Sequence, residues 1–186
     1  LEFDELIIAS GRKEILPAIK GIQKEGVVAV NGLADVKSIQ ENLPIAHTVL
    51  IVGHGPVAQE LARLIAAKKT EVKFFGALEQ PLEGVQEIQD NPIIEILGEA
   101  DVRAVRLANH KVVGATLVIF SGAASPHTDF LKDTDIQIDG GIVVDEAMRT
   151  NLPFVRAAGD VCSRSACGWE AAYASGRKCG ECVCRS

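Results

Sequence analysis

The sequence predicts an α/β fold with a mainly parallel sheet and an attached antiparallel hairpin element. Short apolar strands alternate with helical stretches in the first half of the chain, as expected when helices connect parallel strands. Later, pairs of short apolar segments flank Asn109-His110 and Asp139-Gly140-Gly141, and this is the pattern of β-hairpins.

Composition and charge indicate a globular protein. The chain has 186 residues, of which 47% are hydrophobic and 24% charged. A net charge of -6 and an aromatic content of 4% argue against nucleic acid as a partner. No apolar run approaches the ~18 residues that cross a bilayer, and the first residues lack the features of a signal peptide. We therefore expect a cytoplasmic protein with no membrane partner.

The first 47 residues are expected to hold two strands and a helix. A short strand at 6–9 stops at Gly11, and a second at 27–30 stops at the following Asn-Gly pair. Apolar residues then repeat at helical spacing over 33–43, and Pro44 ends that helix.

Residues 48–75 form the most informative stretch. A continuous apolar run at 48–52 is typical of a strand buried on both faces. Two glycines follow, and Pro56 then occupies the first helical position, which suits its fixed φ. A helical stripe continues to about Ala67, and the next strand is expected at 71–75. Strand, glycine turn, helix and strand together predict a βαβ unit.

The glycine turn reads Gly53-x-Gly55-x-x-Ala58. The first glycine permits a tight turn, the second lets a pyrophosphate approach the backbone, and the small third residue lets helix and strand pack closely. The phosphates would lie at the helix N-terminus, where backbone N–H groups and the helix dipole favour an anion. Because a strand precedes and a helix follows, we predict a Rossmann-like dinucleotide site; a purely structural turn is the alternative.

The acidic residue that usually binds the adenosine 2′-OH is missing. Its place at the end of the second strand is taken by Gly76, and Glu79 lies a few residues further on. Lys68 and Lys69, which would favour a 2′-phosphate, precede that strand. The choice between NAD and NADP stays open, as does a weakened or lost site.

The second half of the chain is expected to be rich in strands. Residues 76–91 are polar, with at most one short helix, and a last helix is expected from 169 to about 178. The strands expected between them are 93–97, 102–107, 111–113, 116–120, 136–138, 142–144 and 155–158. The four histidines share no metal-ligand spacing, so they predict no metal site, and His54 is expected to be a loop residue rather than a catalyst.

Four segments resemble those of one known family, in the family's order. They are FDELIIASGRKEILPAIKG, VLIVGHGPVAQELA, LVIFSGAASPHTDFL and VVDEAMRTNLPFVRAAGDV. On these segments the sequence is similar to the FAD-dependent pyridine nucleotide-disulfide oxidoreductase superfamily, which includes NADH oxidases and rubredoxin and nitrite reductases. Ala9-Ser10-Gly11 stands where the family usually has Ala-Thr-Gly.

The resemblance implies two sets of cofactor-binding residues, with the catalytic residues unknown. Glu60 matches a glutamate near the nicotinamide, Gly122 a glycine that borders the nucleotide, and Asp160 the aspartate that hydrogen-bonds the flavin ribityl chain. The NAD(P) set is Gly53, His54, Gly55, Pro56, Val57, Ala58, Glu60, Gly76 and Gly122. The FAD set is Ser10, Gly11, Gly159 and Asp160.

The resemblance also implies three parts of the chain. Residues 1–21 resemble the segment that leaves an FAD domain, 22–120 an NAD(P)-binding domain, and 121–186 the re-entry into the FAD domain with a Cys-rich tail. The family's first glycine-rich unit, which holds the FAD pyrophosphate, is missing from the sequence. We therefore expect a fragment that binds FAD poorly, is inactive alone and exposes apolar surface that favours a homo-oligomer.

All five cysteines lie between residues 162 and 184, so a disulfide of the thioredoxin-reductase type within the nucleotide domain is not expected. Three interpretations remain open: free thiols on the last helix and tail, a redox-active pair in the tail, and a zinc or iron–sulfur site. The cysteines are Cys162, Cys167, Cys179, Cys182 and Cys184.

Two functions follow. In the first, the chain is the NAD(P)H-binding portion of a flavin-dependent oxidoreductase that transfers hydride from NAD(P)H to FAD and electrons onward to an unknown acceptor, with a redox carrier protein among the candidates. In the second, it is a non-catalytic nucleotide-binding or assembly module that needs a partner chain.

Overall fold

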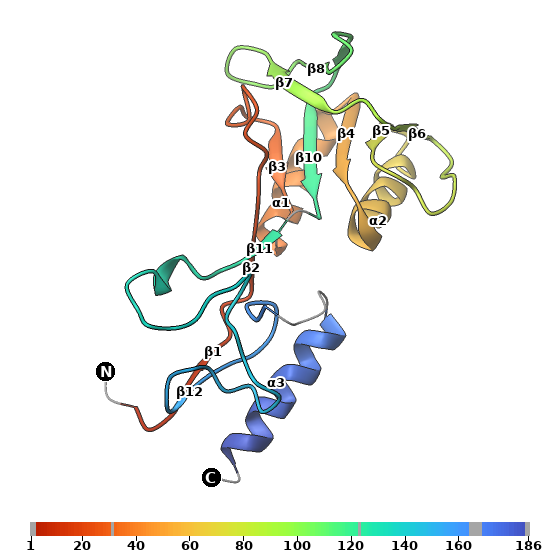
Figure 1. The fold of residues 1–186 in the computed structure, drawn as a ribbon. Coiled ribbons are helices and arrows are strands. Elements are labelled where there is room, and N and C mark those ends of the chain that lie inside the picture. The colour runs from red at the N-terminus through yellow and green to blue at the C-terminus, as the bar shows by residue number, and fades with distance from the viewer. Residues whose placement is uncertain (1–2, 31, 123, 164–168, 185–186) are drawn as a thin grey trace. The chain divides into compact units, whose positions relative to one another are not determined.

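The computed structural model describes residues 3–30, 32–122, 124–163 and 169–184. The chain forms two compact units, which we call the central unit (residues 14–123) and the terminal unit (residues 1–13 and 124–186). Figure 1 shows the elements of both units, and each unit is described by itself.

A five-stranded sheet forms the middle of the central unit, with the strand order β3-β10-β4-β5-β6 and every neighbouring pair parallel (Figure 1). The strands are β3 (Val27–Ala29), β4 (Thr48–Gly53), β5 (Glu71–Phe75), β6 (Val85–Ile88) and β10 (Leu117–Ser121). All five residues of β10 are buried, because β10 lies between two other strands and both faces of the sheet are covered.

Two helices cover one face of this sheet. They are α1 (Leu33–Asn42), which continues into the 3₁₀ segment η1 (Leu43–Ile45), and α2 (Gly55–Ala66). Ile39 of α1 and Ile65 of α2 belong to the same apolar cluster as Ile51 of β4.

An antiparallel sheet covers the other face of the parallel sheet. Its strands are β7 (Ile93–Leu97), β8 (Ala104–Leu107) and β9 (Val112–Gly114). Leu50 of β4 packs on this side in a cluster with Ile96 and Val105. Successive residues of β4 therefore face opposite layers, and this explains why the strand is apolar at every position.

Most elements lie within one or two residues of the predicted positions, but the prediction for residues 76–91 is wrong. The sequence predicts at most one short helix over 76–91, whereas 85–88 form the edge strand β6. β6 pairs on one side only, and its two middle residues, Gln86 and Glu87, are exposed. An edge strand of this kind has no apolar run, so its sequence does not distinguish it from a loop.

Two strands of the terminal unit pair in parallel, β1 (Leu6–Ile8) with β12 (Val155–Ala157). A second two-stranded sheet joins β2 (Arg12–Glu14) and β11 (Ala124–Pro126). The unit also contains the 3₁₀ segment η2 (Asp129–Leu131) and α3 (Trp169–Val183), which runs further than the predicted end near residue 178. Its core includes Ile8, Ile142, Val155, Val161 and Cys162.

The hairpin predicted around residues 139–141 is present only as a tight turn. Asp139 N–H donates to the carbonyl of Gly141 at 2.8 Å, and a single bridge joins Ile138 and Ile142. In the described part of the chain, no helix is long and apolar enough to cross a membrane.

Truncating Ile51 tests the core. Ile51 is fully buried between the helices and the sheet, so Ile51→Ala should lower the free energy of unfolding by about 2–5 kcal/mol in urea denaturation followed by circular dichroism. The control is Leu64→Ala on α2, where the side chain is 48% exposed and the free energy of unfolding should change by no more than about 0.5 kcal/mol. Equal effects of the two substitutions would contradict this packing.

Candidate dinucleotide site

Three neighbouring parallel strands of the central unit end close together, with a glycine at or directly after the end of each. Gly53 is paired with Ser121, and a Cβ atom at Gly53 would lie 1.8 Å from the carbonyl oxygen of Ser121. A Cβ atom at Gly76 would lie 2.2 Å from the carbonyl oxygen of Gly53, and one at Gly122 would lie 2.8 Å from that of His54. The carboxyl ends of β4, β5 and β10 can therefore approach this closely only because the residues there are glycines, which have no side chain.

The two glycines of the turn after β4 have different structural roles. Gly53 is required by the sheet, because of its contact with Ser121. Gly55 has a φ of +81°, and a Cβ atom there would meet no other atom within 4 Å. A side chain at Gly55 would therefore enter the space outside the turn, where a ligand would approach the backbone.

Helix α2 begins directly at this turn. His54 is its extended N-cap residue, makes no side-chain hydrogen bond to the helix, and donates its backbone N–H to Ser121 at 3.3 Å. The first turn, residues 55–58, carries no acidic side chain, and Pro56 has no N–H to satisfy. The remaining first-turn N–H groups have no partner within the helix, and they together with the helix dipole attract an anion. Ala58 is fully buried against the sheet, as close packing of helix on strand requires.

A pocket of about 450 Å³ opens at the carboxyl ends of β4, β5 and β6. Its volume falls in the range of small-molecule sites. Gly76 contributes to its wall, together with Asp90 and the aromatic rings of Phe75 and Phe120. The loop after β5 borders the pocket, which therefore lies at the same edge of the sheet as the glycine turn.

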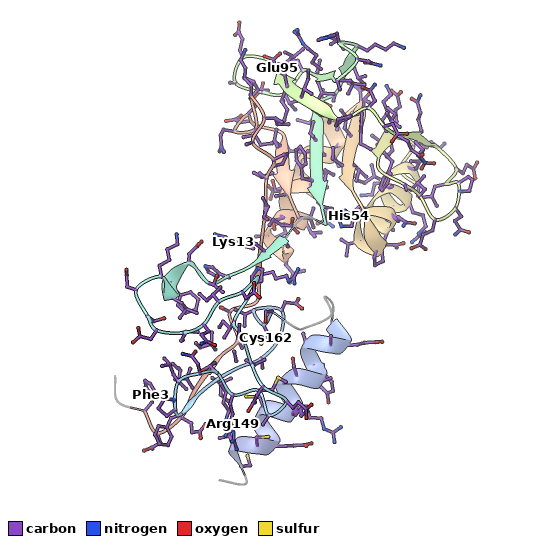
Figure 2. The ribbon with its side chains drawn as sticks, viewed as in Figure 1. Phe3, Lys13, His54, Glu95, Arg149 and Cys162 are labelled. Carbon is purple, nitrogen blue, oxygen red and sulfur yellow. The ribbon has the colours of Figure 1, made fainter. Side chains whose placement is uncertain are left out.

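Two other predicted NAD(P) residues, His54 and Gly122, lie where β10 ends. The imidazole of His54 lies next to Gly122, since a Cβ atom at Gly122 would lie 3.3 Å from the Nδ1 atom of His54. Figure 2 shows His54 where β10 ends and α2 begins. Glu60 lies one turn into α2, exposed, with an oxygen 2.5 Å from the guanidinium of Arg63. The hydrogen bond from Arg63 lowers the pKa of Glu60.

Two residues that fix the loop after β5 are missed by sequence reasoning. Glu87 on β6 accepts the backbone N–H of Leu78 at 3.0 Å, and Gln59 on α2 accepts that of Glu79 at 3.3 Å. No sequence signal could have identified them, because both contacts depend on how β6 and α2 lie beside the loop.

The predicted FAD residues come together in the terminal unit. Because β1 and β12 are parallel, Ser10-Gly11 and Gly159-Asp160 follow strands that end at the same edge. Arg12 Nε donates to the carbonyl of Asp160 at 3.2 Å, and this hydrogen bond links the two turns. Gly159 N–H donates to Ser175 Oγ on α3 at 2.9 Å. The NAD(P) set lies in the central unit and the FAD set in the terminal unit.

The described cysteines are thiols, and none of them forms a disulfide with another. Cys162 and Cys179 are buried; burial, with a smaller effect of Cys179, raises the pKa of Cys162 to about 11. Burial also raises the pKa of Cys179. Cys167 lies outside the described residues, and within the described ranges no three His, Cys, Asp or Glu side chains are grouped as a metal site. Thiols with raised pKa values react slowly.

Fold and glycine turn together define a Rossmann-like α/β domain. The chain belongs to the pyridine nucleotide-disulphide oxidoreductase family, whose model matches residues 1–176. The family predicted from the four segments is thereby confirmed, as is the α/β fold class.

The chain is similar to several curated and solved members. It is 27% identical over 179 residues to the ferredoxin–NAD(+) reductase component of the biphenyl dioxygenase system of Paraburkholderia xenovorans, covering 87% of this chain and 44% of that protein. It is 28% identical over 180 residues to an NADH oxidase of Enterococcus faecalis, covering 86% of this chain and 40% of the relative. The structure of an NAD-dependent persulfide reductase from A. fulgidus shares the fold, with a TM-score of 0.90 and 24% identity over 98% of this chain and 39% of that one. The chain spans less than half the length of these three proteins.

Thiol labelling tests the burial of the cysteines. With a pKa of about 11, only about one Cys162 in a thousand is a thiolate at pH 8, so an alkylating reagent should modify exposed Cys184 well before Cys162. Mass spectrometry of native and urea-unfolded samples measures this, and the difference between the two sites should largely disappear in urea. Labelling of Cys162 as fast as Cys184 in the native protein would contradict the structure.

Proposed function

We propose that this chain is the NAD(P)H-binding portion of a flavin-dependent oxidoreductase. The observation that carries the proposal is the open space at Gly55, beside an uncapped helix N-terminus and three strand ends that approach as bare backbone. A diphosphate placed there would meet N–H groups and the positive end of a helix dipole, with no side chain in its way.

The rest of the dinucleotide would extend to both sides of this point. The adenosine half would lie towards the pocket beside Gly76 and Asp90 at the ends of β5 and β6. The nicotinamide half would lie towards His54, Gly122 and Glu60, on the side of β10. This direction follows from the strand order, in which β5 and β10 flank β4.

The residues proposed to hold FAD are Ser10, Gly11, Gly159 and Asp160. They fit the role, because Gly11 has a φ of +67° and a Cβ atom there would meet no other atom within 4 Å, so the backbone of this turn is open to a ligand. Arg12, bound to the carbonyl of Asp160, holds the two turns in register. When bound, FAD supplies the flavin that accepts hydride from NAD(P)H and passes electrons onward. The protein's own share of the reaction is to bind and orient the two cofactors.

The names of the relatives support this assignment. One is a ferredoxin–NAD(+) reductase component and another an NADH oxidase. By analogy, the electron acceptor of the whole protein would be a redox carrier protein or oxygen.

A second candidate function is a non-catalytic nucleotide-binding or assembly module that needs a partner chain. The observation that favours it is the apolar edge of the terminal unit, where Leu6 and Ile7 of β1 are exposed. An additional strand or a second copy of the chain would cover these side chains.

Replacing Gly55 tests nucleotide binding. In Gly55→Ala the new methyl group would occupy the space where the diphosphate approaches, so NADH affinity measured by calorimetry should fall about tenfold or more. The matched control is Gly140→Ala, which also has a positive φ (+61°) and open space at its Cβ, but lies in the terminal unit. Both substitutions should destabilise the protein by about 1 kcal/mol from backbone strain. If both variants bind NADH as the unsubstituted chain does, the diphosphate does not lie at this turn.

A further inference from the structure

The carboxyl ends of β5 and β6 carry only negative charge. Between Phe74 and Ile93 the sequence has four acidic residues and no Lys, Arg or His. All four acidic residues are exposed: Glu79, Glu83, Glu87 and Asp90. Glu83 precedes β6, at its amino end, whereas Glu79, Glu87 and Asp90 lie in the part of the proposed site that the adenosine half of the dinucleotide would reach.

The usual position for an acidic selectivity residue is sterically closed here. Gly76 has a φ of +154°, and any side chain would begin 2.2 Å from the carbonyl oxygen of Gly53. The glycine is therefore a requirement of the contact between β4 and β5, and its presence does not indicate a lost site. A negative charge that discriminates between nucleotides must come from another element.

Glu87 on β6 is placed to supply this charge. Its carboxylate accepts the N–H of Leu78, two residues beyond Gly76, so it lies beside the loop that borders the pocket. Gln89 Nε2 donates to the same carboxylate oxygen at 2.5 Å. These two hydrogen bonds lower the pKa of Glu87, so it is charged at neutral pH. Asp90, with a φ of +54°, lines the pocket itself.

The basic residues of β5 and α2 do not offset these carboxylates. Lys73 on β5 lies 3.0 Å from Glu71, and Arg63 on α2 is paired with Glu60. Lys68 and Lys69 follow the C-terminal end of α2, at the opposite end of the helix from the glycine turn.

We propose that the site selects NAD(H) over NADP(H), with Glu87 and Asp90 as the residues that determine the selectivity. The inference rests on the proposed function. A 2′-phosphate adds about 1.5–2 negative charges, and NADP(H) would bring them beside these two carboxylates. The selectivity therefore comes from repulsion of the wrong nucleotide.

Calorimetric titration of the whole chain with NADH and with NADPH tests the proposal. At about 0.1 M salt, where screening extends over about 10 Å, NADH should bind about tenfold tighter than NADPH. At about 1 M salt the screening length falls to about 3 Å, and the ratio of the two dissociation constants should approach one.

Two nearly isosteric substitutions identify the residues responsible. Glu87→Gln keeps an oxygen that can accept the Leu78 N–H, and Asp90→Asn suits a positive φ, so each removes a charge with little change of structure. The double variant should reduce the preference for NADH about threefold or more. The control is Glu99→Gln, which removes one exposed charge at the opposite, amino edge of the sheet. Glu99 lies there because the carbonyl of its neighbour Ala100 accepts the backbone N–H of Glu25, just ahead of β3.

Each result supports or overturns the proposal. Equal binding of NADH and NADPH by the unsubstituted chain overturns the selectivity and leaves the proposed function standing. A preference for NADH that the double variant changes no more than Glu99→Gln overturns the role of Glu87 and Asp90. Binding of neither nucleotide overturns the selectivity together with the proposed function.

Discussion

The close approach of β4 to its two neighbours is the constraint on which the central unit depends. Gly53 lies against the carbonyl of Ser121 on one side, and its own carbonyl lies against Gly76 on the other. These contacts leave no room for a Cβ atom, so the middle of the carboxyl edge consists of backbone alone. Backbone N–H groups and the N-terminus of α2 are therefore left to bind a ligand at this edge.

This constraint separates the roles of the glycines. Gly53 and Gly76 are fixed by the sheet, whereas Gly55 is surrounded by open space and is free to serve a ligand. A single motif thus contains one residue that stabilises the fold and another that keeps a surface accessible. In the proposed site, the same constraint would move the choice between nucleotides from the end of β5 to side chains of β6 and the loop after it, because a Cβ atom at Gly76 would lie 2.2 Å from the carbonyl oxygen of Gly53.

The terminal unit contributes a second pair of turns with a different origin. They are aligned because β1 and β12 are parallel neighbours, although about 150 positions of the sequence separate Leu6 from Val155. The buried thiols of Cys162 and Cys179 in the same unit have raised pKa values, which is the behaviour of core residues rather than of nucleophiles.

The sequence by itself determined the βαβ unit, the glycine turn, the α/β class and the family, because each depends on local pattern: an apolar run, two glycines, a proline at a helix start. It could not show β6, whose exposed middle residues resemble a loop, nor the hydrogen bond of Glu87 to Leu78. Nor could it distinguish the glycine that the sheet requires from the one that leaves open space. Those features were decided by the tertiary structure, because they arise from strands and loops that meet only after the chain has folded.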